Sequence, residues 1–196
     1  MMDDDATRQA VREAYSSAAR RPKSEHPFPV GRRFAASVGY PAKVIRALPK
    51  KAVEAFSGVS NLAVASDINA GERVLDLGCG SGLDVLVASR RVSPGGWVIG
   101  VDFSHAMLVR AGEAIREDGA SNIQLVLAEG ERIPLADGSI DVALANGIFN
   151  LNPYRSKLFH ELGRVVRKGG TVRAAELIIK YPLPQTERGD LSTWFA

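Results

Sequence analysis

The sequence predicts a doubly wound α/β fold with a parallel sheet, and three observations carry that prediction. From Glu72 onward, short apolar runs with strand character alternate with stretches whose apolar residues repeat at helical spacing. The predicted strands are apolar at successive positions, which is typical of parallel strands covered on both faces. The first strand leads into a glycine-rich turn, as at the first crossover of many doubly wound sheets.

Five strands and three helices of the core follow from this alternation. The strands are predicted at 73–78, 97–102, 123–129, 141–146 and 171–179. The helices are predicted at 83–92, after an N-cap at Ser104, and from Pro153 to a glycine C-cap at 168–170. A topological switch beside the first strand, where the glycine turn opens, predicts the spatial order 3-2-1-4-5.

The first sixty residues lack strong strand patterns and predict a helical arm or lid. Asp5 can cap a helix that reaches Ala19, a proline-rich break follows, and short helices are predicted at 42–48 and 49–56. This arm holds 11 basic and 6 acidic side chains. The basic pairs are dispersed without interleaved aromatics, so a solvated surface is favoured over nucleic-acid binding. The predicted organisation is an arm at 1–60, a core at 61–180 and a tail at 181–196.

Length and composition exclude several classes of protein. The chain has 196 residues, of which 45% are apolar and 24% charged, so one soluble domain with an appended segment is expected. No apolar run of about 18 residues is present, and the acidic start is unlike a secretory signal. The single cysteine, Cys79, allows neither a disulfide framework nor a thiolate metal site within one chain. We therefore expect a cytoplasmic protein without a metal centre or a membrane anchor.

The most informative stretch for function is the glycine turn after the first predicted strand. It reads Asp-Leu-Gly-Cys-Gly-Ser-Gly from Asp76 to Gly82, and Leu83 stands where a dinucleotide-binding fingerprint would have its last glycine. Glycines there let the backbone approach a nucleotide-like ligand. The carboxylate of Asp76 would repel a pyrophosphate and attract an amine, so a dehydrogenase is disfavoured.

Two further acids follow the next two predicted strands. Asp102 ends the second strand and could accept hydrogen bonds from both hydroxyls of a ribose, or cap the helix after Ser104. Glu129 ends the third strand beside Gly130 and could bind an adenine amino group, or be a solvated loop acid. The carboxyl ends of parallel strands meet at one edge of a sheet, so these acids should lie near the glycine turn.

The sequence resembles the class I S-adenosylmethionine (SAM)-dependent methyltransferases, which share a Rossmann-like sheet. The resemblance spans about residues 70–180 and rests on VLDLGCGSG, VIGVDFSHAML, AEGERIPLADGSIDVALAN and FHELGRVVRKGG, in that order. It implies SAM as the cofactor, a small-molecule methyl acceptor, and an arm that folds over both. The implied cofactor-binding residues are Asp76, Gly78, Cys79, Gly80, Gly82, Asp102, Phe103, Met107, Glu129, Gly130 and Asn146, with Tyr15 and Tyr40 from the arm.

A closer likeness is to the arsenite methyltransferases. It rests on VREAYSSAAR, on the stretch from GYPAKVIRALP to VLDLG, and on NGIFNLNP. That family holds arsenic(III) with cysteine thiolates, and the corresponding positions here are Val59 and Gly147. Soft arsenic needs soft sulfur ligands, and Cys79 lies inside the cofactor loop. We therefore expect an acceptor other than arsenite.

No catalytic base stands out. His26, His105 and His160 have no orienting acid visible in the sequence, and proximity and orientation can suffice for methyl transfer. The Asn-Pro-Tyr run at 152–154 is explained by a proline opening a helix, rather than by a clamp for a flipped base. A non-catalytic SAM-binding protein derived from an arsenite-methyltransferase-like ancestor remains the alternative to an enzyme.

The end of the chain departs from the resemblance. Seven strands are usual in that family, and the 17 residues after Ile179 are too few for a helix and two more strands. The fifth strand is then an apolar edge, which favours a homodimer through that edge, a cover formed by 181–196, or aggregation. Trp194 and Phe195 are the expected covering groups.

Overall fold

A five-stranded parallel sheet forms the centre of the computed structural model, which describes residues 4–178. The spatial order is β3-β2-β1-β4-β5, as predicted. All four pairings between neighbouring strands are parallel. The strands are β1 (Arg73–Leu77), β2 (Trp97–Asp102), β3 (Ile123–Leu127), β4 (Ile140–Asn146) and β5 (Val166–Ala175).

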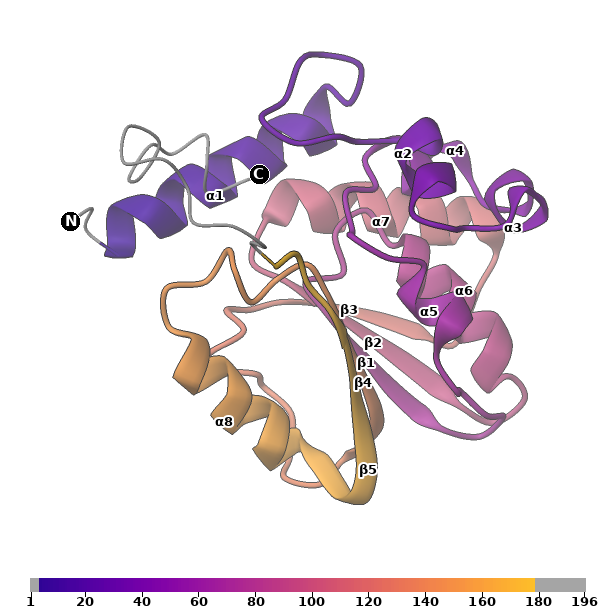
Figure 1. Cartoon of the computed structure of the whole chain (residues 1–196). Helices are drawn as coiled ribbons and strands as arrows, with labels where there is room; N and C mark the ends of the chain where they lie inside the picture. Colours follow the sequence, from indigo (N-terminus) through magenta and orange to yellow (C-terminus); the bar gives the residue numbers. More distant parts are fainter. Residues whose placement is uncertain (1–3, 179–196) are drawn as a thin grey trace.

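Helices cover both faces of this sheet, as a doubly wound fold requires (Figure 1). The helices α6 (Leu83–Val92) and α7 (His105–Asp118) lie on one face, and α8 (Arg155–Val165) lies on the other. Successive side chains of a strand point to opposite faces of the sheet, so each face has its own apolar core. In β1 and β4, one set of side chains packs with Leu86 of α6, namely Val74, Val142 and Leu144. The intervening side chains pack with Leu158 of α8, namely Leu75, Leu77, Ala143 and Ala145.

The boundary between α8 and β5 differs from the prediction. The helix begins at Arg155 and ends at Val165, and β5 starts at the next residue. The glycine pair at 169–170 is therefore not a helix C-cap but part of β5, where the register with β4 shifts between Ile140 and Val142. A Cβ at Gly170 would lie 2.7 Å from the carbonyl oxygen of Asp141, so this irregular strand approaches β4 too closely for a side chain. The strand also ends at Ala175 rather than Ile179.

Five helices precede the sheet. They are α1 (Asp4–Arg20), α2 (Arg32–Ser37), α3 (Ala42–Ala47), α4 (Lys50–Glu54) and α5 (Leu62–Ala65). The sequence predicted α1, α3 and α4, while α2 and α5 are additional short helices. The α2–α5 segment contributes buried residues to the same apolar cluster as α6 and the sheet, whereas α1 crosses the carboxyl end of the sheet (Figure 1).

The fifth strand is an edge of the described sheet. Val172 of β5 is 42% exposed, but Arg167, Lys168 and Arg173 of the same strand are exposed as well, so the exposed surface of this edge is of mixed character. The proposed covering groups Trp194 and Phe195, and any strand after residue 178, lie outside the described residues, and the homodimer stays a prediction. Within residues 4–178, no helix is both long and apolar enough to cross a membrane.

Candidate functional site

A cavity opens at the carboxyl end of the sheet, beneath α1. It comprises about 1000 Å³ of space, part of it continuous with solvent. Most of the predicted site residues line it, namely Tyr15, Asp76, Gly78, Cys79, Gly80, Asp102, Phe103, Glu129, Gly130 and Asn146. Three predicted residues, Tyr40, Gly82 and Met107, are not among its lining groups. The strand ends and the arm thus meet around one site.

The glycine turn presents its backbone to this cavity. Gly78 and Gly80 have φ angles of 74° and 52°, in the left-handed region that favours glycine. A Cβ at Gly78 would lie 2.4 Å from Cγ2 of Ile148, so a side chain there would displace the loop after β4. The turn is also fixed from behind, because the Gly80 N–H donates to Oδ2 of Asp102 at 2.8 Å.

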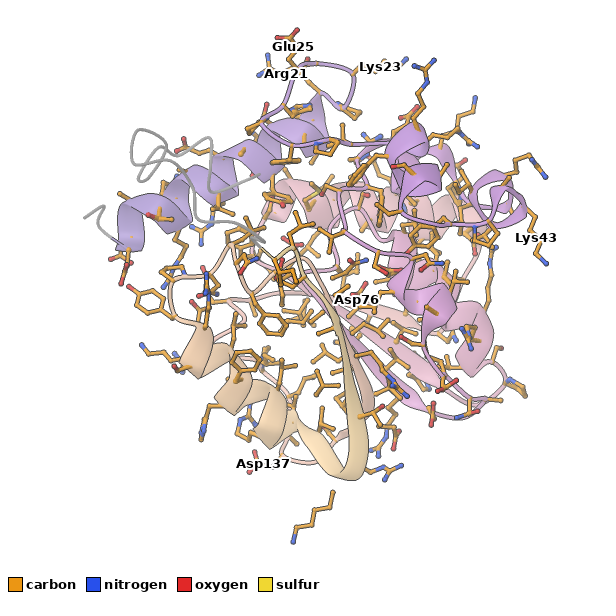
Figure 2. All side chains as sticks on the ribbon, viewed as in Figure 1. Arg21, Lys23, Glu25, Lys43, Asp76 and Asp137 are labelled. Atoms are coloured by element: carbon orange, nitrogen blue, oxygen red, sulfur yellow. The ribbon has the colours of Figure 1, made fainter. Side chains whose placement is uncertain are left out.

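Asp76 is a buried carboxylate with an unused hydrogen-bonding atom. Its side chain lies in the interior between the sheet and the N-terminal helices (Figure 2), and it is 2% exposed. Oδ2 has no hydrogen-bond partner among the described residues. Burial, with the nearby carboxylates of Asp84 and Asp102, raises the pKa of Asp76 well above its usual range. An acceptor atom in such a position is suited to a cationic donor such as an amine.

Asp102 is positioned by two backbone donors. Its Oδ2 accepts from the Gly80 N–H, and its Oδ1 accepts from the N–H of Ser104, each at 2.8 Å. Burial raises the pKa of Asp102 to about 6, although these hydrogen bonds favour the charged form. Each carboxylate oxygen can accept a second hydrogen bond, so Asp102 can still bind a pair of hydroxyl groups.

Glu129 does not stand free in the cavity, because arginines of α1 contact it. Arg12 donates a hydrogen bond to Oε1, and the Arg8 guanidinium lies 3.9 Å from Oε2. The Arg12 guanidinium also lies over the ring of Phe103, 5.3 Å from its centroid. The residues predicted to surround an adenine are therefore in direct contact with the arm.

The main residue that sequence reasoning missed is Asp84. This buried carboxylate accepts from the Tyr40 hydroxyl, from the backbone N–H of Ala63 at 3.2 Å and from Nδ2 of Asn146 at 2.9 Å. The sequence offered only a weak signal, an acid before the apolar run 85–88, because an acid in the first turn of a helix is ordinary. Tyr40 is thus a buried partner of Asp84 behind the cavity wall.

Asn146 joins this network to the chain before α5. Its Oδ1 accepts from the backbone N–H groups of Val59 and Ser60, at 2.9 and 3.1 Å. Its Nδ2 donates to the carbonyl of Ser60 at 2.8 Å, besides the bond to Asp84. All the hydrogen-bonding groups of this amide are therefore engaged within the protein.

Gly82 and Met107 have packing positions outside the cavity lining. Gly82 precedes α6 with a φ of 87°, and a Cβ there would lie 3.1 Å from that of Ala111. Met107 is 1% exposed and packs with Ala18 and Phe28 beneath α1. Ser104 caps α7 as predicted, accepting from the Met107 N–H at 3.3 Å.

The two positions compared with arsenic ligands lie side by side. A Cβ at Gly147 would lie 3.1 Å from Cγ1 of Val59. Neither residue has a sulfur atom, and the Cys79 thiol points behind the turn, where a Cβ at Gly100 would lie 3.0 Å from Sγ. Burial raises the pKa of this thiol well above its usual value, which disfavours a thiolate.

Solved structures with a similar fold include methyltransferases. A SAM-dependent methyltransferase from Aquifex aeolicus matches with a TM-score of 0.54 and 26% identity, covering 62% of this chain and 66% of that one. An arsenic(III) S-adenosylmethionine methyltransferase from Chlamydomonas reinhardtii matches with a TM-score of 0.61 and 32% identity, covering 82% of this chain and 52% of that one.

Sequence relatives extend the same picture. The chain is 35% identical over 133 residues to an arsenite methyltransferase of Halobacterium salinarum, covering 68% of this chain and 34% of the relative. It is 36% identical over 110 residues to a phosphatidylethanolamine N-methyltransferase of Cereibacter sphaeroides, covering 55% of this chain and 52% of the relative. The chain thus spans about a third to a half of these relatives. A family model described as a methyltransferase domain matches residues 68–194, and the chain belongs to that methyltransferase family.

Proposed function

We propose that this chain binds SAM in the cavity and transfers its methyl group to a small-molecule acceptor other than arsenite. The observation that carries the proposal is the unpartnered Oδ2 of Asp76, buried beside the exposed backbone of the glycine turn. None of the ion pairs among residues 4–178 includes Asp76, Asp84 or Asp102, so a cationic ligand would meet carboxyl groups that have no basic side chain as counter-ion. SAM is a cationic ligand with an amine and two ribose hydroxyls, and it fits this wall of carboxyl groups.

Each residue has a definite part in this proposal. Asp76 would accept from the amine, Asp102 from the ribose hydroxyls, and the backbone of Gly78 and Gly80 would border the ligand without steric conflict. Phe103 and Glu129 would border the adenine. When bound, SAM supplies a methyl group already activated by its sulfonium centre. The protein's contribution is to orient the two partners and to exclude water with α1, and such positioning can account for about 7–11 kcal/mol of a barrier.

Titration calorimetry with SAM, S-adenosylhomocysteine and NAD tests the cofactor assignment. We expect both adenosyl ligands to bind. Asp102→Ala should weaken binding by about 1.5–3 kcal/mol, because charge-assisted hydrogen bonds to two hydroxyls are lost. Asp67→Ala is the matched control, since Asp67 is an exposed acid paired with Arg173 on the protein surface. Binding of NAD without SAM, or an unchanged affinity in Asp102→Ala, would refute the assignment.

Turnover separates the enzyme from a protein that only binds SAM. The purified chain is incubated with SAM and a pool of small-molecule metabolites, and S-adenosylhomocysteine is quantified against a reaction without the pool. Acceptor-dependent release supports methyl transfer. Binding without any release over the whole pool favours the non-catalytic alternative.

A further inference from the structure

The cavity has two chemically different halves. One half is formed by the glycine turn and by the ends of β2 and β3, and it holds the carboxylates described above. The other half is formed by α1, the chain at 55–58 and the loop after β4. Its walls are mostly apolar, with contributions from Val11, Phe56, Ile148, Leu151 and Pro153. Ile148 marks the boundary, because its side chain lies against Gly78 of the glycine turn.

Several polar groups of the apolar half have hydrogen-bond partners within the protein. Asn146 uses both its amide oxygen and its amide nitrogen in the network with Asp84 and Ser60. Asn152 accepts from the backbone N–H of Tyr154 at 2.7 Å. Burial raises the pKa of Tyr15, so its hydroxyl keeps its proton. A ligand in this half thus meets an Asn146 amide that is fully engaged, while the buried Nε–H of Arg8 has no hydrogen-bond partner among residues 4–178.

The positive charge in this half is paired with acids of the protein. Arg8 is the one basic side chain among the described lining residues. Its guanidinium lies 3.4 Å from a carboxylate oxygen of Glu131 and 3.9 Å from one of Glu129. It also lies over the ring of Tyr154, 4.8 Å from the centroid. Two acids and a ring therefore compete with any anionic ligand for this one cation.

We infer that the methyl acceptor is an uncharged, predominantly apolar small molecule, and not a phosphate, a carboxylate or another oxyanion. This inference rests on the proposed function, since it assigns the carboxylate-lined half to SAM. Moving a phosphate or carboxylate into the apolar half would remove it from water without a free cation to receive it. A neutral molecule would instead gain from burying apolar surface against these walls.

Matched pairs of probes test the inference on the protein loaded with S-adenosylhomocysteine. The pairs are 1-naphthol with 1-naphthyl phosphate, and 1-octanol with octyl phosphate, each followed by equilibrium dialysis. We expect the neutral member of at least one pair to bind about tenfold or more tightly than its phosphate. Tighter or equal binding of both phosphates, or no binding of either neutral probe, would overturn the inference.

Two variants locate the binding. Leu151→Asp should weaken binding of the neutral probe about tenfold, because it places a charge in the apolar wall. Leu151→Ala should weaken it less. Val109→Asp is the control, since Val109 is a half-exposed residue of α7 outside the lining. An equal loss in Leu151→Asp and Val109→Asp would contradict binding in this half.

The failure of the inference is distinguishable from the failure of the proposed function. Binding of S-adenosylhomocysteine is measured first, without any acceptor probe, and its absence would refute the function. Normal cofactor binding with preferential binding of the phosphates would refute the inference alone. Arsenite with excess thiol is run as a separate arm, and methylarsenicals above a control without enzyme would overturn the exclusion of arsenite in the proposed function.

Discussion

The helix α1 and the α2–α5 segment both precede the sheet, but the structure attaches them in different ways. Buried apolar side chains hold α2–α5, and Ala35, Ile45, Ala52 and Val53 are each no more than 2% exposed within the main core cluster. In α1, Val11 and Ala18 are also buried, but Ala18 lies in a separate small cluster with Phe28 and Met107. The first half of α1 also has ion pairs of Arg8 and Arg12, whose side chains are 28% and 37% exposed. The predicted arm at 1–60 thus contains two parts with different attachments.

This difference has an energetic consequence. Full burial of an aliphatic side chain contributes about 1.5–3 kcal/mol, whereas a solvent-exposed ion pair contributes about 0–1 kcal/mol. We therefore expect α2–α5 to unfold together with the sheet, and α1 to open on its own. Under the proposed function, opening of α1 would admit ligands, while the carboxylate wall formed by Asp76, Asp84 and Asp102 stays intact.

The largest effect should come from removing the polar link between α2–α5 and the core. Asp84→Ala leaves the Tyr40 hydroxyl, the Ala63 N–H and an Asn146 N–H without their buried acceptor. We expect a loss of about 3 kcal/mol or more in the free energy of unfolding, measured with urea. Asp67→Ala should change it by less than about 0.5 kcal/mol, since Asp67 is exposed. A comparably small loss in Asp84→Ala would mean that α2–α5 does not depend on this network.

The second largest effect should be a dependence of cofactor affinity on pH, which probes the carboxylate wall rather than α1. The pKa of Asp102 is raised to about 6 by burial, so the ionised form that accepts from hydroxyls is lost below that value. The affinity for S-adenosylhomocysteine should fall about tenfold between about pH 7 and pH 5, measured by calorimetry. Asp102→Asn should abolish most of this dependence. A pH profile that persists unchanged in Asp102→Asn would assign the effect to another group.

The effect of Asp102 on stability should have the opposite sign. Its pKa is higher in the folded than in the unfolded protein, so the folded state binds more protons between about pH 4 and pH 6. Protonation of Asp102 therefore contributes stability as the pH falls through 6, over the same interval in which cofactor binding weakens. Urea unfolding without ligand separates this contribution from binding.

The parts of the molecule that the sequence predicted are those specified by local pattern. The glycine turn and the Ser104 cap follow from residues within a few positions of one another, and the strand order follows from the topological switch expected beside the first strand. The glycine pair at 169–170 was assigned wrongly, because glycines after a helix fit both a C-cap and an irregular strand. Pairing with β4, which is not a local property, decides between the two.

Local sequence pattern does not predict side-chain contacts between segments that are distant in the chain. Asp84 lies in the first turn of α6, where an acid is ordinary, and its partners Tyr40 and Asn146 are 44 and 62 residues away in sequence. Arg12 contacts Glu129 across 117 residues. The sequence identified Glu129 as a candidate site residue, but the ion pair with α1 depends on how the arm crosses the sheet.

The smallest effect, and the most direct test of the comparison, concerns the attachment of α1. Arg12→Gln removes the ion pair with Glu129 and the contact over Phe103, and such half-exposed interactions contribute about 0.2–1 kcal/mol. Amide exchange in α1 should therefore accelerate by about 1.4-fold to fivefold, while exchange in α4 stays unchanged. Raising the salt concentration to about 0.5 M should act in the same direction on the wild type, because it screens the pair. Arg20→Gln makes the same substitution at the exposed end of α1 and should leave exchange unaltered. If α1 and α4 exchange at one common rate in every variant, the two parts of the arm open together and the distinction between them is wrong.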